Sequence, residues 1–197
     1  IILTIHYPEL YETIKQQIDI MRDPSDWDYL LYLETTNSGQ LITQLIPSNG
    51  TTFLNFKIDL LKLALSKKAI LLDLPDDDLI PLVELLHHIS LRETLHVFDL
   101  QSQVSNADVA IKLFGINHLY GSTTETPLFE KLNRKGTLLI KNIHFLDIES
   151  QKNLAQLIRY GFYSIFKSDR RVQSDVRIIC STNQDLSALV QENRFSQ

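Results

Sequence analysis

From residue 51 onward, short apolar runs alternate with longer stretches of helical spacing. Short, mainly apolar runs predict strands that are covered on both faces of a sheet. They occur at residues 69–72, 95–98, 138–140 and 176–180, where only His96 and Arg177 are not apolar. Apolar residues spaced as on one face of a helix predict helices at 53–65, 79–89, 105–114, 128–133 and 149–160. Strands that alternate with helices pair in parallel through right-handed crossovers. The expected fold is therefore α/β, a three-layer sandwich around a mainly parallel sheet.

The first 48 residues follow a different pattern, which predicts a separate small α+β segment. Residues 11–21 have helical spacing, whereas 29–33 and 41–46 predict two strands of a hairpin that turns at 35–40. This turn faintly resembles a phosphate-binding loop, but it lacks the lysine and the metal-binding hydroxyl, so a hairpin is preferred. We expect a segment over 1–48, the end of a sensory or receiver-like domain, then a linker at 47–50 and a domain over 51–197.

Composition and charge narrow the classes of partner and of location. The net charge of −5 gives no electrostatic reason to expect binding to nucleic acid or to anionic membranes. The single cysteine, Cys180, lies in an apolar run, so a disulfide framework is excluded and a buried thiol is expected. No apolar run approaches the ~20 residues of a membrane span. Because the chain starts without Met or a basic segment, we expect a piece of a longer cytoplasmic protein.

Polar residues follow the strand at 138–140 directly. Lys141 and Asn142 stand at the carboxyl edge of the predicted sheet, where α/β proteins place their chemistry. Nucleotide hydrolases place there an acid that holds Mg²⁺, often beside a second acid that polarises water. In this chain a cation and an amide occupy the two positions, so the sequence predicts a nucleotide site without its acids.

Several motifs resemble the AAA+ domain of bacterial sigma-54-dependent transcription activators. Residues 136–143, GTLLIKNI, resemble the family's GTLFLDEI, and 175–186, DVRIICSTNQDL, resemble its VRVIAATNRDL. Residues 192–195, ENRF, resemble EGRF, while KLFG at 112–115 and LFE at 128–130 resemble the motifs that flank the family's signature loop. The resemblance covers roughly 51–197 and stops before the family's helical lid and DNA-binding domain. It implies a P-loop NTPase core without a lid.

The resemblance also implies that the phosphate-binding loop is degenerate. The family's GESGTGKE corresponds to residues 74–81, which begin Leu74, Pro75, Asp76, Asp77, Asp78, Leu79 and Ile80. Glycines let backbone N–H groups close on phosphates and the lysine neutralises them, and this stretch contains neither residue. Each aspartate would repel phosphate by about 4 kcal/mol at ~4 Å and an effective dielectric of ~20. Metal binding by the three aspartates is the alternative to a charged helix start, which is preferred.

Other site positions implied by the resemblance have also changed. Lys141 and Asn142 correspond to the family's Asp-Glu pair, and Asp99 corresponds to an asparagine that restrains that glutamate. Ile165 corresponds to a trans-acting arginine. Asn183 alone matches, as the sensor after the last strand. The preferred interpretation is that Thr182 and Asn183 cap or turn the following segment without any nucleotide. We expect no catalytic residue, no metal and no cofactor, and hence a pseudo-ATPase.

The family's GAFTGA loop, which contacts the sigma factor, corresponds to a shorter segment between Gly115 and Leu128. The candidate partner loop comprises His118, Leu119, Tyr120, Gly121, Ser122 and Thr123, and only Tyr120 to Ser122 echoes the motif. The implied partners are proteins, either sigma-54 RNA polymerase or AAA+ relatives, with a homo-oligomer as a further expectation. Direct binding of nucleic acid or membrane by this chain is not expected.

Three functional hypotheses follow from these observations. The preferred one is a non-hydrolysing AAA+-like regulatory or assembly module of a sigma-54-activator-type transcription regulator, such as a response regulator. The first alternative is a functional ATP-binding sigma-54-dependent activator with atypical motifs. The second alternative is a protein-interaction scaffold unrelated to transcription, because fold alone does not fix function.

Overall fold

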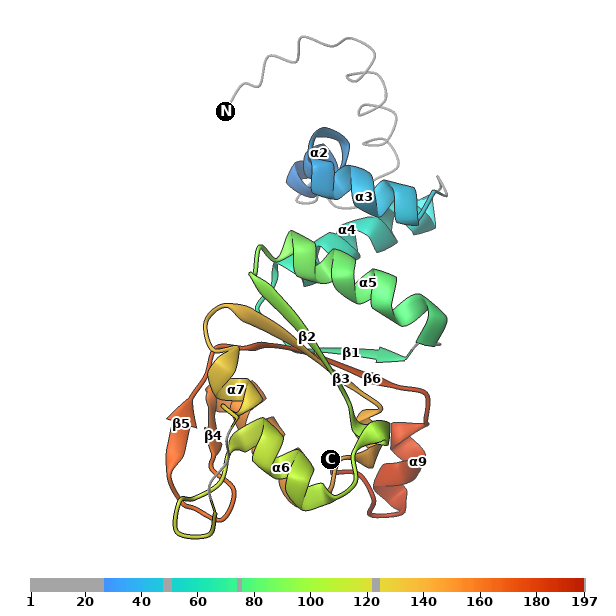
Figure 1. Cartoon of the computed structure of the whole chain (residues 1–197). Coiled ribbons are helices and arrows are strands. Elements are labelled where there is room, and N and C mark those ends of the chain that lie inside the picture. Colours follow the sequence, from blue (N-terminus) through green and yellow to red (C-terminus); the bar gives the residue numbers. More distant parts are fainter. Residues whose placement is uncertain (1–26, 48–50, 74–75, 122–124, 197) are drawn as a thin grey trace, which may run out of the picture. The chain divides into compact units, whose positions relative to one another are not determined.

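The computed structural model describes residues 27–47, 51–73, 76–121 and 125–196 (Figure 1). The helix predicted at 11–21 and most of the predicted linker lie outside these ranges. The chain forms two compact units, one of residues 1–66 and 88–90 and one of residues 67–87 and 91–197. Within the described ranges, every helix is too short or too polar to cross a membrane.

The described part of the first unit is helical, so the predicted hairpin is wrong. Helix α2 (Trp27–Thr35) and helix α3 (Asn37–Leu45) replace the two strands, and helix α4 (Thr51–Leu65) follows. The predicted turn is a junction between two helices, because the side chain of Thr36 caps α3 by accepting the Gly39 N–H at 3.0 Å. Gly39 packs against the backbone of Leu33, where a larger side chain would collide. Local capping therefore overrides the strand preference of the apolar runs.

The second unit contains the predicted parallel sheet. Its strands are β1 (Ile70–Asp73), β2 (Thr94–Asp99), β3 (Gly136–Lys141) and β6 (Arg177–Thr182), in the order β1-β6-β3-β2. All neighbouring pairs are parallel. The two central strands, β3 and β6, are buried almost throughout, as expected for strands covered on both faces. The predicted α/β class and parallel pairing are confirmed.

Helices lie on both sides of this sheet. Figure 1 shows α5 (Asp76–Ile89) on one side and α6 (Asn106–Phe114) and α7 (Leu128–Lys131) on the other. Helix α8 (Ile148–Tyr160) joins α6 and α7 in one apolar core, and helix α9 (Leu186–Gln191) follows β6. Short 3₁₀ turns, Leu100–Ser102 and Ile143–Phe145, follow β2 and β3. The arrangement gives three layers, as predicted.

An aromatic cluster forms part of this core. The rings of Phe114, Phe129 and Tyr163 lie 5.3 to 5.8 Å apart between centroids, a spacing that adds to the gain from burial alone. Burial raises the pKa of the Tyr163 hydroxyl to about 12. The thiol of Cys180 is also buried and free, as predicted, and burial raises its pKa to about 12. Both groups are therefore neutral at physiological pH.

The sequence did not predict the hairpin that follows α8. Strands β4 (Phe162–Ser164) and β5 (Arg171–Gln173) pair antiparallel, and each is too short to give a periodic signal. Asn153 of α8 holds the hairpin, since its amide donates to the Ser164 carbonyl and accepts the Ser164 N–H, both at 2.7 Å.

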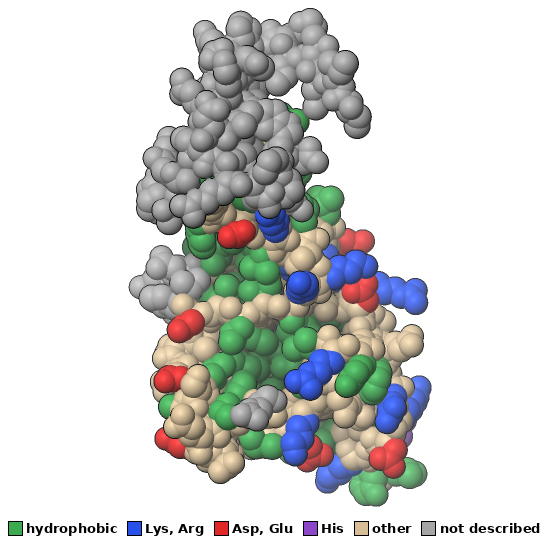
Figure 2. Space-filling view, turned by 180° about the vertical axis from the view of Figure 1, so that it is seen from behind, with side chains coloured by type: hydrophobic (Ala, Val, Ile, Leu, Met, Phe, Trp, Pro, Cys, Tyr) green, Lys and Arg blue, Asp and Glu red, His purple; other side chains and the backbone are tan. Residues whose placement is uncertain are grey.

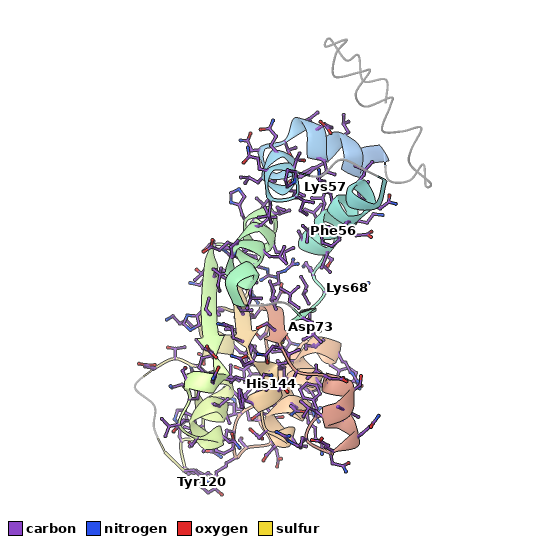
Figure 3. All side chains as sticks on the ribbon, turned by 90° about the vertical axis from the view of Figure 1, so that its right-hand side faces the viewer. Phe56, Lys57, Lys68, Asp73, Tyr120 and His144 are labelled. Atoms are coloured by element: carbon purple, nitrogen blue, oxygen red, sulfur yellow. The ribbon has the colours of Figure 1, made fainter. Side chains whose placement is uncertain are left out.

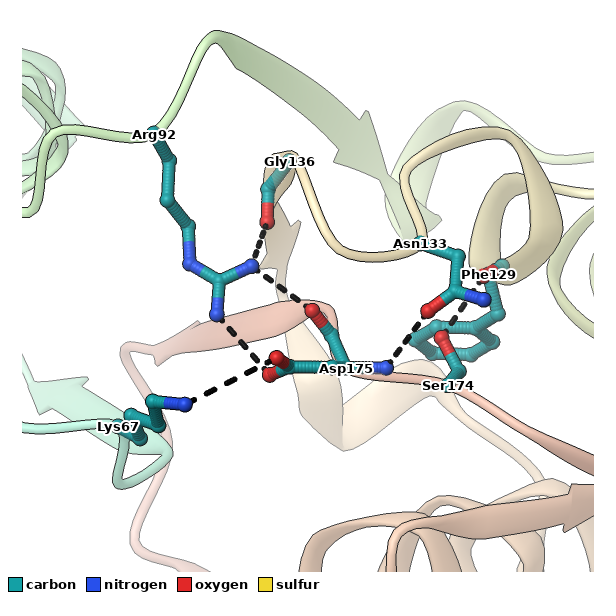
Figure 4. Close-up of polar contacts among 7 residues, drawn as sticks. All are labelled: Lys67, Arg92, Phe129, Asn133, Gly136, Ser174 and Asp175. Carbon is teal, nitrogen blue, oxygen red and sulfur yellow. Dashed lines mark hydrogen bonds and ion pairs between the residues drawn. The ribbon is translucent and has the colours of Figure 1, made fainter.

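Polar contacts join the starts of three strands (Figure 4). The Arg92 guanidinium donates to the Gly136 carbonyl at 3.2 Å and to the backbone and side-chain oxygens of Asp175 at 2.8 and 3.0 Å. The Asp175 N–H donates to Asn133 Oδ1 at 2.8 Å, and the Ser174 hydroxyl donates to the Phe129 carbonyl at 2.8 Å. These bonds fix the relative positions of β2, β3 and β6.

An apolar hollow lies over β1 and α8. Its volume is about 320 Å³, and apolar side chains such as Leu71, Leu154, Ile158 and Phe195 line it. Figure 2 shows apolar side chains gathered at the centre of one face of the molecule.

Two helices end at glycines with positive φ, and these glycines should respond differently to substitution. Gly115 after α6 has φ 80°, and a methyl group there would meet the Pro127 ring at 2.8 Å, whereas Gly161 after α8 has φ 75° and open space around it. Gly161→Ala should cost about 1 kcal/mol of the free energy of unfolding, the left-handed penalty alone. Gly115→Ala should cost at least about 2 kcal/mol. Urea unfolding measures both, and equal losses would contradict this account.

Candidate functional site

The carboxyl edge of the sheet collects the polar residues that the sequence singled out. The parallel register places Asp99 at the end of β2 opposite Lys141 at the end of β3. It also places Asp73 at the end of β1 opposite Thr182 at the end of β6. Because parallel strands end on one side, residues from distant parts of the chain meet there.

Asp99, Lys141 and Asn142 form one cluster of contacts, called here the edge cluster. The Asn142 amide donates to Asp99 Oδ1 at 2.9 Å, and the Lys141 ammonium lies 3.7 Å from Asp99 Oδ2. The Lys141 and Asp99 side chains are 15% and 34% exposed, and a pair so placed contributes on the order of 1 kcal/mol. The edge cluster thus pairs the carboxylate of Asp99 within the protein.

Asp99 has a second role that the sequence analysis missed. It caps the 3₁₀ turn after β2, since its Oδ1 also accepts the Gln101 N–H at 3.0 Å. Its carbonyl accepts the Ser102 hydroxyl at 2.8 Å and the Gln103 amide at 3.0 Å. An aspartate directly before a turn is a recognisable cap signal, so this role could have been predicted. The cap and the ion pair together fix the carboxylate in one position.

The backbone of Asn142 also fits its place. Asn142 has φ 58° in the left-handed region and is only 7% exposed. Asparagine and aspartate tolerate this conformation better than other residues with a side chain. Asn142 is therefore suited both to the turn after β3 and to the hydrogen bond with Asp99.

His144 and Thr182 extend the polar edge toward β6. His144 Nδ1 lies 3.0 Å from Thr182 Oγ1, which accepts the Gln184 N–H at 3.1 Å. Burial, and then the charge of Arg194, lower the pKa of His144, so its ring is neutral at pH 7. Asn183 is exposed, and the turn after β6 is held by Thr182 while Asp185 caps α9.

The phosphate-loop position lies next to this edge. Helix α5 begins at Asp76, with only Leu74 and Pro75 between it and the end of β1 at Asp73. Leu74 and Pro75 lie outside the described residues. Leu79 is fully buried and Ile80 is half-buried, so this part of the helix serves the core. The sequence at 74–81 contains none of the glycines that let backbone N–H groups surround phosphates.

The described edge cluster lacks the pair of acids that the family resemblance implies for holding Mg²⁺. Mg²⁺ prefers oxygen ligands, above all carboxylates, and an ammonium group has no lone pair to offer. The Asn142 amide points its N–H groups at Asp99, and Lys141 lies against the same carboxylate. Among the residues that the structure describes, no three His, Cys, Asp or Glu side chains come together as a metal site.

The β4–β5 turn, which contains Ile165, contacts the residues that precede the candidate partner loop. Ile165 closes the β4–β5 hairpin, where its N–H donates to the Arg170 carbonyl at 3.1 Å. The neighbouring Phe166 donates to the Gly115 carbonyl and accepts the Asn117 N–H, at 3.1 and 3.2 Å. Figure 1 shows this hairpin on the opposite side of the unit from α9. The sequence did not predict that the two segments touch.

The tip of the partner loop is exposed. Leu119 is 88% exposed, Tyr120 is also exposed, and the Lys167 ammonium lies 5.7 Å from the centre of the Tyr120 ring. Figure 3 shows Tyr120 far from His144, at the end of the loop. His118 and Gly121 are exposed too, whereas Ser122 and Thr123 lie outside the described residues.

Comparison with known proteins decides the family. The model of the sigma-54 interaction domain matches residues 82–197, more than half of the chain. The chain belongs to the sigma-54 interaction domain family. The resemblance of the sequence motifs to transcription activators is thereby confirmed.

Several relatives of this sigma-54 interaction domain are similar over shorter stretches. The PTS-dependent dihydroxyacetone kinase operon regulatory protein of Escherichia coli K12 is 37% identical over 67 residues, which are 34% of this chain and 10% of the relative. Regulatory protein AtoC of the same organism is 32% identical over 75 residues, 38% of this chain and 16% of AtoC. The chain thus spans a small part of these relatives.

A solved structure shares the fold of this sigma-54 interaction domain. NtrX from Brucella abortus in complex with ADP matches with a TM-score of 0.62 at 15% identity, covering 87% of this chain and 39% of NtrX. The complex of NtrX with ATP matches with a TM-score of 0.59 at 17% identity, covering 83% and 34%. At these identities the likeness concerns the fold alone.

Replacing Asn142 by aspartate tests the edge cluster. Asn142→Asp keeps the shape and the left-handed backbone but sets a second carboxylate against Asp99. The loss should be about 2 kcal/mol of the free energy of unfolding at pH 7. It should shrink as pH falls toward 4, because one protonated carboxyl can then donate to the other.

Asn183→Asp, at an exposed position, is the matched control and should lose little at either pH. Urea unfolding at pH 7 and pH 4 measures all three proteins. If Asn142→Asp lost the same free energy of unfolding at both pH values, repulsion between the two carboxylates would not be the cause of the loss.

Proposed function

We propose that this chain is a non-hydrolysing regulatory or assembly module of a sigma-54-activator-type transcription regulator. The observation that carries the proposal is the edge cluster. The two positions at which the family resemblance implies a metal-binding acid and a catalytic acid hold an ammonium and an amide, both directed at Asp99. A carboxylate that is paired within the protein needs no bound cation to offset its charge.

The phosphate-loop position supports the same proposal. Three consecutive aspartates open α5, where the positive end of a helix would otherwise attract phosphate. Their negative charges repel the phosphates of ATP instead. Two separate parts of the nucleotide site thus oppose binding: the edge cluster lacks the acids that would hold Mg²⁺, and the start of α5 repels the phosphates.

The proposed work of the chain lies in its protein contacts. Candidate partners are sigma-54 RNA polymerase and hydrolysing members of the same family, with which the chain would share an oligomer. The exposed Leu119 and Tyr120 would serve the first contact. Ile165 would affect the contact with a hydrolysing family member, because the resemblance implies at this position an arginine that acts on the neighbouring subunit.

Mixing this chain with a hydrolysing family member tests the proposal. At equimolar ratio, random assembly leaves about half of the active sites beside Ile165 rather than an arginine, so hydrolysis per active subunit should fall about two-fold. Phosphate release at a fixed concentration of the active member measures the effect. The chain alone should release no phosphate.

Ile165→Arg is the matched variant and should relieve the loss, because it returns a cation to the neighbouring site. An unchanged rate at excess chain would overturn co-assembly. Equal losses with both forms would overturn the role of Ile165. Hydrolysis by the chain alone would favour the alternative of an ATP-binding activator.

A further inference from the structure

The opposite edge of the sheet has a different chemistry from the carboxyl edge. Because all four strands are parallel, the residues that precede them lie together at the amino edge. These residues are Lys67 and Lys68 before β1, Leu91 to Glu93 before β2, Arg134 and Lys135 before β3, and Asp175 before β6. Lys68 precedes β1 at this edge, whereas Asp73 ends β1 at the carboxyl edge.

The amino edge is basic although the chain as a whole is acidic. Glu93 and Asp175 are its acidic residues, and the carboxylate of Asp175 is held by Arg92 at 3.0 Å and by Lys67 at 4.0 Å (Figure 4). Arg134 and Lys135 are exposed. They lie at the same edge as this clamp, the group of contacts that Asp175 makes with Arg92 and Lys67. A local excess of positive charge therefore stands on a chain of net charge −5.

Two turns at this edge hold unusual residues. Leu91 has φ 56° and Arg134 has φ 67°, a left-handed conformation that costs stability for residues with a side chain. Leu91 is also 88% exposed. Glycine or asparagine would suit both turns better, so folding alone does not account for a leucine and an arginine there.

A hollow opens beside the cations. Its volume is about 350 Å³, and Lys67, Lys68 and Asp175 line it together with apolar side chains of α8 and β6. The apolar lining includes Leu157, Ile158 and Ile178. Such a hollow could accept an apolar side chain from a bound segment whose neighbouring residues are acidic and contact the cations.

We propose that the amino edge is a docking surface for an acidic protein segment that carries an apolar side chain. The acidic groups contact Lys67, Arg134 and Lys135, while the apolar side chain enters the hollow or packs on Leu91. Across four strands the edge measures about 14 Å, three interstrand spacings. A segment of about four extended residues crosses that distance.

The same observations favour a short protein segment over nucleic acid. Within a Debye length of about 8 Å a short acidic segment meets mainly the local positive charge. A nucleic-acid duplex extends well beyond that length and meets the net negative charge of the chain. The amino-edge residues include no aromatic side chain on which a single-stranded base could stack.

Fluorescence anisotropy with two synthetic peptides tests the proposal. One short peptide carries glutamates around a central leucine, and the other replaces that leucine by glycine. The full chain should bind the leucine peptide more tightly than the glycine peptide, and added salt should weaken both. Arg134→Glu combined with Lys135→Glu should weaken binding at least ten-fold, with an unchanged melting temperature because both side chains are exposed.

Lys167→Glu combined with Arg170→Glu is the matched control, since these exposed cations lie in the β4–β5 turn and Lys167 also has positive φ. It should change affinity less than two-fold. Equal losses of affinity in the two double variants would show that binding depends only on net charge, and this result would overturn the proposal. Tighter binding of a DNA duplex than of the leucine peptide would overturn it in favour of nucleic acid, and equal affinity for the two peptides would overturn the role of the hollow.

Discussion

The parallel register of β2 and β3 is the constraint on which the candidate site depends. It sets Asp99 opposite Lys141, and the residue after the strand, Asn142, then reaches the same carboxylate. One negative charge is thus met by a cation and an amide from the neighbouring strand. In a hydrolysing relative the resemblance places acids at those positions, where a metal ion must balance them. Here Lys141 and Asn142 offset the negative charge of Asp99.

The two edges of the sheet divide the proposed functions. At the carboxyl edge the polar groups contact one another, and the sequence at 74–81 contains no glycine that would let backbone N–H groups surround phosphate. At the amino edge, cations flank a clamp that joins three strands. Strand pairing needs neither the exposed Leu91 nor the exposed Arg134. The surfaces of the domain, rather than its nucleotide site, are where we expect it to act.

The sequence predicted the second unit well because its strands are buried on both faces. Residues 138–140 are all apolar and residues 176–180 are apolar except for Arg177, and both stretches form strands. The prediction for the first unit was wrong because the apolar runs at 29–33 and 41–46 are compatible with either a helix or a strand. The cap at Thr36 favours the helix. The hairpin after α8 escaped notice because its strands have three residues each.

The site was predictable by position but not by contact. Motif matching brought Asp99, Lys141 and Asn142 to the same edge, yet it could not show that they bind one another. The contact between Phe166 and residues 115–117, which precede the partner loop, is a bridge between distant segments that no local pattern encodes. Geometry of this kind follows from packing the whole unit, so it needs the three-dimensional structure.

Calorimetric titration of the chain with Mg-ATP and Mg-ADP tests the central claim most directly. We expect no heat of binding for either nucleotide, because the Asp99 carboxylate is already paired with Lys141 and Asn142 and the aspartates at the start of α5 repel phosphate. A dissociation constant tighter than about 100 μM for either nucleotide would contradict it. The chain would then bind nucleotide in a way that the paired carboxylate of Asp99 does not prevent.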